Sequence, residues 1–134
     1  MSQPCPCGRL GPRGQPLALE ACCGRYLDGP APAPDAESLM RSRYSAFVLE
    51  RPAYLQATWH ASQRPEALSL EAGVKWLGLE VKAHRVIGVD YAEVEFVARS
   101  RTHGRGQRLH ERSRFVRETV NGVQRWWYVD GDML

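Results

Sequence analysis

The chain has 134 residues, of which 43% are hydrophobic and 25% charged, and its formal net charge is +3. This composition is typical of one compact domain with a small appendage, and it argues against a second full domain and against a strongly basic nucleic-acid binder. The longest apolar runs are far shorter than the ~20 residues that a membrane-spanning helix needs, so no membrane role is expected.

Residues 1–30 contain all four cysteines, with many glycines and prolines and no helical or strand periodicity. We expect a cytoplasmic protein, because this segment lacks the apolar stretch of a signal peptide, and cysteines in a reducing compartment bind metal more often than they form disulfides. Cys5 and Cys7 are separated by fourteen residues from the adjacent pair Cys22 and Cys23. Four soft ligands in two close pairs predict a closed structural zinc site in a loop-rich knuckle. Redox chemistry at the adjacent pair is the alternative.

A linker of alternating proline and alanine, within residues 29–34, follows the cysteine segment. It divides the chain into a zinc-binding module at 1–30 and a larger domain at 31–134. Asp35 is the predicted N-cap of a helix that ends near Glu50, because apolar residues recur at helical spacing after it.

Two shorter helical segments are predicted next, one from Pro52 to His60 and one or two turns from Glu66 to Ala72. From Lys75 onward the apolar period changes to two. The predicted strands are 77–84, 92–98, 109–116 and 124–130. Helices followed by strands are typical of an α+β domain in which the helices pack on one face of a curved antiparallel sheet.

Matching the apolar faces of the strands pairs Val94 with Phe115, which places Glu95 across from Arg114 on the outer face. The stretch from Arg99 to Arg117 has seven arginines and one acidic residue. With glutamates beside it, this stretch is better explained as a solvated strand face than as a nucleic-acid surface. Nucleic-acid binding there stays an alternative.

Several polar and aromatic side chains are candidates for lining a pocket between helices and sheet. They are Arg43, Tyr44, Tyr54, Trp59, His60, Glu111, Ser113, Tyr128 and Asp130. Arg43 lies on the apolar face of its helix and needs a partner, for which Glu111 is the first choice and Asp130 the second. Such a pair is either a structural tie, which we favour, or an anchor for an anionic ligand.

The sequence resembles known bacterial families at several places. Residues 5–8 (CPCG) with 22–24 (CCG) resemble the SEC-C zinc-binding motif, and residues 39–47, 76–79 and 127–131 are similar to the YchJ-like family. The resemblance implies a nuclear-transport-factor-2-like domain, a cystatin-like cone in which helices and a curved antiparallel sheet enclose a pocket. It implies no particular activity.

We therefore expect a zinc-binding protein that acts as a binding or adaptor module for a small ligand or a protein partner. The alternative is an isomerase- or hydrolase-like enzyme with His60 or Glu111 as base and Arg43 or Tyr44 holding the substrate. His60 at a helix C-terminus is also explained as a cap, which we favour. The sequence has no recognisable nucleophile–base arrangement and no dinucleotide fingerprint.

Overall fold

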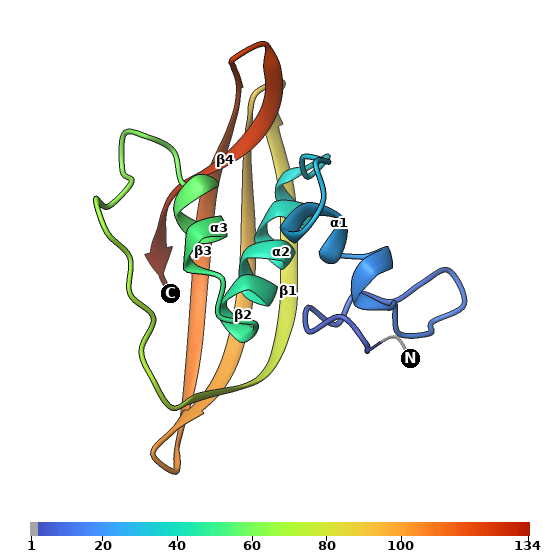
Figure 1. Cartoon of the computed structure of the whole chain (residues 1–134), viewed down its shortest axis with the longest axis vertical. Helices are drawn as coiled ribbons and strands as arrows, with labels where there is room; N and C mark the ends of the chain where they lie inside the picture. The colour runs from blue at the N-terminus through green and yellow to red at the C-terminus, as the bar shows by residue number, and fades with distance from the viewer. Residues whose placement is uncertain (1–2) are drawn as a thin grey trace.

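A four-stranded antiparallel sheet carries two helices on one face, and the N-terminal cysteine segment lies beside the longer of them (Figure 1). The computed structural model describes residues 3–134. Its helices are η1 (Leu19–Ala21), α1 (Gly24–Leu27), α2 (Ala36–Val48) and α3 (Pro52–Ala57). Its strands, adjacent in chain order, are β1 (Val74–Gly88), β2 (Tyr91–Thr102), β3 (Arg105–Val120) and β4 (Val123–Met133). The predicted α+β fold is confirmed.

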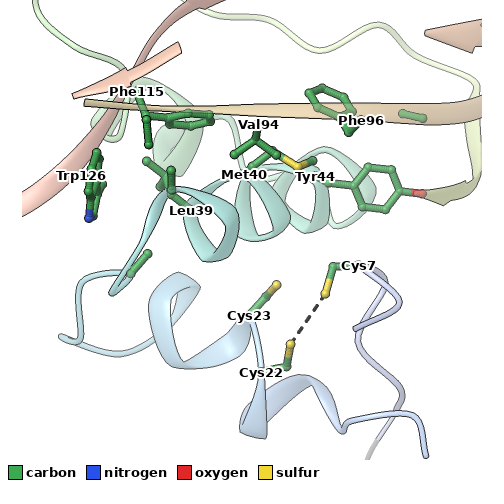
Figure 2. Packing of buried hydrophobic residues seen from close by; sticks show 14 of the residues in the cluster. Cys7, Cys22, Cys23, Leu39, Met40, Tyr44, Val94, Phe96, Phe115 and Trp126 are labelled. Carbon is green, nitrogen blue, oxygen red and sulfur yellow. Dashed lines mark hydrogen bonds between the residues drawn. The ribbon is translucent and has the colours of Figure 1, made fainter. Parts of the chain in front are cut away.

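The start of α2 is determined by its cap. The carboxylate of Asp35 accepts a hydrogen bond of 2.7 Å from the backbone N–H of Ser38, as expected for an N-cap. Leu39, Met40 and Tyr44 are buried along α2 and pack toward the inner face of the sheet (Figure 2). In the described part of the chain, no helix is long and apolar enough to cross a membrane.

The helical predictions after α2 hold only in part. Pro52 begins α3 as expected, but the helix ends at Ala57, because Trp59 then forms a parallel bridge with Tyr128 of β4. The helical turn predicted for 66–72 is wrong, since the structure has no helix there. Gln56 instead donates hydrogen bonds to the carbonyl oxygens of residues 65 and 66, which holds this connection against α3.

Strand β1 departs from simple alternation. The pairing of β1 with β2 is irregular at two places, between Trp76 and Gly78 and between Val81 and Ala83. At each place β1 has one residue more than β2. Each added residue exchanges the two faces of the strand. The predicted inward position of Leu77 is therefore wrong, and its side chain is 48% exposed. His84, predicted on the outer face, pairs with the core residue Val94 and faces Glu37 of α2.

The other registers also differ in detail. Val94 pairs with Ser113, two residues from the predicted partner Phe115, so the inner and outer faces are still those predicted. Asn121 and Gly122 form the predicted turn with positive φ angles of 54° and 78°. An irregularity in the β3–β4 pairing next to Phe115 then places Asp130 across from Arg114, on the outer face of the sheet.

The core continues through α2 into the cysteine segment. One buried cluster contains Leu39, Val94 and Phe115 together with all four cysteines. Figure 2 shows α2 between the sheet and the labelled cysteines. Helix α2 therefore contributes to two packing layers, and the division of the chain at residue 30 stays a prediction.

Candidate functional site

The four cysteines form one cluster. Their sulfur atoms all lie within 4.8 Å of one another, and Cys7 Sγ is 3.6 Å from both Cys5 Sγ and Cys22 Sγ. A tetrahedral metal–thiolate centre with bonds of about 2.3 Å places its sulfurs about 3.8 Å apart. All four cysteines are free and buried. Figure 2 shows Cys7, Cys22 and Cys23 together on the side of α2 away from the sheet. The spacing fits a single metal ion.

The pKa shifts of the cysteines also indicate a metal site. Hydrogen bonds from Cys23 and Cys7 lower the pKa of Cys5, whereas burial and the charges on Cys7 and Cys5 raise the pKa of Cys22 to about 12. The hydrogen bond to Cys5 is also the main cause that raises the pKa of Cys23. One thiolate thus opposes the ionisation of the next, and four thiolates at this spacing need a cation.

Local turns and helix α2 hold the sulfurs in place. Gly8, with a φ of 75°, closes a tight turn through its N–H bond of 3.3 Å to the Cys5 carbonyl. From α2, Arg41 Nη1 donates to the Cys7 carbonyl at 3.0 Å, and Ser45 Oγ lies 3.6 Å from Cys5 Sγ. The larger domain therefore supports the cluster directly.

A cavity of about 280 Å³ lies between the helices and the inner face of the sheet. Its walls are mostly aromatic and aliphatic. Six of the candidate residues line it, namely Arg43, Tyr44, Trp59, Glu111, Ser113 and Tyr128. Phe47 and Trp76 also line it, although neither is a predicted candidate. Phe47 lies four residues after Arg43 on the same helix face, which is the signal that could have found it.

Tyr54 and Asp130 are not among the residues that line the cavity. The hydroxyl groups of Tyr54 and Ser42 lie 2.7 Å apart and bond to each other. Asp130 accepts a 2.6 Å hydrogen bond from Arg114, on the outer face of the sheet. The irregularity in the β3–β4 pairing next to Phe115 explains why Asp130 lies on the outer face.

His60 also lies away from the cavity. Its Nε2 is 2.9 Å from Glu118 Oε1, and its Nδ1 is 2.7 Å from Ser62 Oγ. Because α3 ends at Ala57, the predicted role of His60 as a helix cap is wrong. Its backbone N–H instead donates to the Tyr128 carbonyl, which ties the end of the helical region to β4.

Arg43 is 7% exposed and lies in the wall of the cavity. Its Nη1 donates to the Leu55 carbonyl and to Thr58 Oγ1, both at 2.7 Å. Its guanidinium carbon lies 4.4 Å from the centre of the Tyr128 ring and 5.2 Å from that of Trp59. Burial lowers the pKa of Arg43 to about 10, so the side chain remains a cation at neutral pH.

Glu111 lies on the sheet side of the cavity. It accepts hydrogen bonds from Ser113 Oγ and, at 3.4 Å, from the Tyr128 hydroxyl. It occupies the space that a side chain at Gly131 would fill. Burial and the neighbouring Glu111 raise the pKa of Tyr128 to about 12. Within residues 3–134 no ion pair joins Glu111 to Arg43, and the predicted pair is therefore wrong.

Four arginines of the stretch from Arg99 to Arg117, one in β2 and three in β3, have acidic partners. The pairs are Arg99–Glu80 at 3.8 Å, Arg112–Glu95 at 3.7 Å, Arg114–Asp132 at 2.8 Å and Arg117–Asp90 at 3.2 Å. Arg114 also contacts Asp130. These pairs agree with the interpretation of the strand as a solvated face.

Comparisons with known proteins match nearly the whole chain. A family model described as "YchJ, middle NTF2-like domain" matches residues 35–131. The chain is 62% identical to a UPF0225 protein of Polaromonas naphthalenivorans over all of both chains. It is 55% identical to a UPF0225 protein of Bordetella pertussis, covering 96% of this chain and 92% of the relative.

Two solved structures are also similar. A crystal structure of a SEC-C motif containing protein from Psychrobacter arcticus has 36% identity and a TM-score of 0.79, covering 96% of this chain and 81% of that one. The solution structure of a SEC-C motif containing protein from Rhodopseudomonas palustris has 29% identity and a TM-score of 0.78, covering 98% and 99%. The similarity therefore includes the cysteine segment as well as the sheet.

Proposed function

We propose that this chain, which belongs to the YchJ-like family of UPF0225 proteins, is a zinc-stabilised binding protein whose cavity takes a small, mainly apolar molecule. The observation that carries this proposal is the cavity of about 280 Å³, with aromatic walls and a few polar groups that converge in it. Ligand sites in proteins have this character. A closed thiolate centre behind α2 would keep that helix in position.

Zinc is the metal that suits the cysteine cluster best. Thiolates are soft ligands, and four of them in a tetrahedral arrangement favour zinc. Cys5, Cys7, Cys22 and Cys23 would saturate the ion and leave no position for water or substrate. Zinc here is therefore proposed as a structural element, and any ligand would bind in the cavity. A reducing cytoplasm would keep these thiols available.

Native mass spectrometry of protein purified without chelator tests both parts of the proposal. We expect one zinc ion per chain and a co-purifying small molecule that dissociates when the protein unfolds. Denaturation without chelator serves as the control for non-specific adducts. A metal-free protein with the mass of a disulfide-bonded form would contradict the zinc site, and a zinc protein that binds no small molecule would favour an adaptor for protein partners.

An enzyme is the second candidate, favoured by one observation. Glu111 lies in the cavity with its carboxylate oriented by Ser113 and Tyr128, as a general base would need. For this candidate we expect Glu111→Gln to abolish turnover in a screen of small substrates while small-molecule binding persists. His60→Ala is the matched control, because His60 lies outside the cavity. Equal turnover in both variants would reject Glu111 as the base.

A further inference from the structure

Arg43 is a buried cation with part of its hydrogen-bonding capacity unused. A guanidinium has five N–H donors, and the two on Nη1 are directed to Leu55 and Thr58. Within residues 3–134, no hydrogen bond from Nε or Nη2 to another residue is found. These two nitrogens form one edge of the planar group. Arg43 is among the residues that line the cavity, and we assign this edge below to a ligand there.

The surroundings of Arg43 orient the charge without neutralising it. The rings of Tyr128 and Trp59 lie at 4.4 Å and 5.2 Å from its guanidinium carbon and hold it through cation–π contacts. No carboxylate of the described residues forms an ion pair with it. The charge of Glu111 only partly offsets the lowering of the Arg43 pKa by burial. A buried charge without an ion-pair partner is costly, and a carboxylate accepting two parallel hydrogen bonds from one guanidinium edge would lower that cost.

Glu111 limits the ligands that fit. It places a carboxylate in the same cavity, on the sheet side, and this charge would repel a second negative group. A phosphate or a dicarboxylate would meet this repulsion. A ligand whose only charge lies at Arg43, and whose far end is apolar or carries an N–H or O–H donor toward Glu111, would meet much less of this repulsion.

We infer that the cavity binds a small monocarboxylate with an apolar body, held by the free Nε–Nη2 edge of Arg43. The inference rests on the proposed function as a small-molecule binding protein and specifies its ligand. The aromatic side chains Phe47, Trp76 and Phe96 would surround the apolar body. Glu111 would select against doubly charged ligands.

Calorimetric titration at neutral pH tests the inference with two carboxylates, 3-phenylpropionate and hexanoate, and their neutral amides. A hydrogen bond to a charged group contributes about 1.5–3 kcal/mol, so we expect the carboxylates to bind about tenfold to a hundredfold more tightly than the amides. Arg43→Lys keeps the charge but loses the two-pronged edge, so it should lose most of this preference. Arg51→Lys, an exposed position paired with Asp28, is the matched control and should keep it.

The outcomes separate the inference from the proposed function. If the amides bind as tightly as the carboxylates, the cavity is a binding site and the role of Arg43 is overturned. If none of the four compounds binds, both the inference and the cavity as a binding site are overturned. Should Arg43→Lys fail to fold, Glu111→Gln provides the second test, because it should tighten carboxylate binding and leave amide binding unchanged. Equal carboxylate affinity in this variant would contradict the charge argument.

Discussion

Replacing Cys7 by serine is expected to release the metal ion and to unfold the cysteine segment while α2 and the sheet stay folded. Cys7 is fully buried among the other thiols, and an alcohol is a poor substitute for a thiolate ligand. Structural zinc in zinc-finger peptides is bound with about 10–16 kcal/mol, which makes this the largest single contribution available to the segment. Its helices η1 and α1 have only three and four residues, too few to persist alone.

Zinc content and hydrogen exchange measure this result. The amide of Cys5, which donates to the Leu17 carbonyl at 2.8 Å, should lose its protection, whereas amides in β2 and β3 should keep theirs. Arg13→Ser, an exposed position in the same segment, is the control and should retain one metal ion. Because Arg41 and Ser45 of α2 contact the cluster, some loss of stability in the larger domain is expected. Cooperative unfolding of the whole chain would show that the division at residue 30 is wrong.

Leu39→Ala is expected to lower the free energy of unfolding of the larger domain by about 2–5 kcal/mol, the range for a buried leucine truncated in a core. Leu39 is 2% exposed and belongs to the cluster that joins α2 to the sheet. The cost has two parts, the lost transfer of apolar surface from water and the cavity that remains. Urea unfolding followed by circular dichroism measures it.

Leu77→Ala is the matched control for Leu39→Ala. Simple alternation along β1 would bury Leu77, but the irregularity between Trp76 and Gly78 leaves it 48% exposed. We therefore expect its truncation to change the free energy of unfolding by no more than about 0.5 kcal/mol. A loss comparable to that of Leu39→Ala would mean that the face assignment of β1 is wrong.

The sequence by itself determined the features that depend on neighbouring residues. The cap at Asp35 and the turn at Asn121–Gly122 follow from local hydrogen bonds and from allowed φ angles. The α+β order follows from hydrophobic periods, and the two cysteine pairs predicted a metal cluster because thiol spacing is a local property. The cap, the turn and each cysteine pair are signals of a few neighbouring residues, and the α+β order is the sum of such local patterns along the chain.

The tertiary structure alone decided the rest. One extra residue in a strand exchanges its two faces, and only packing against the neighbouring strand determines where that residue is accommodated. This is why the side chains of Leu77 and Asp130 lie on the outer face of the sheet and the side chain of His84 lies on the inner face. The partners of Arg43 could not be predicted from the sequence either, because ion pairing depends on distances across the cavity. Packing turned Arg43 to the α3 region and the Tyr128 ring, whereas Glu111 bonds to Ser113 and to the Tyr128 hydroxyl.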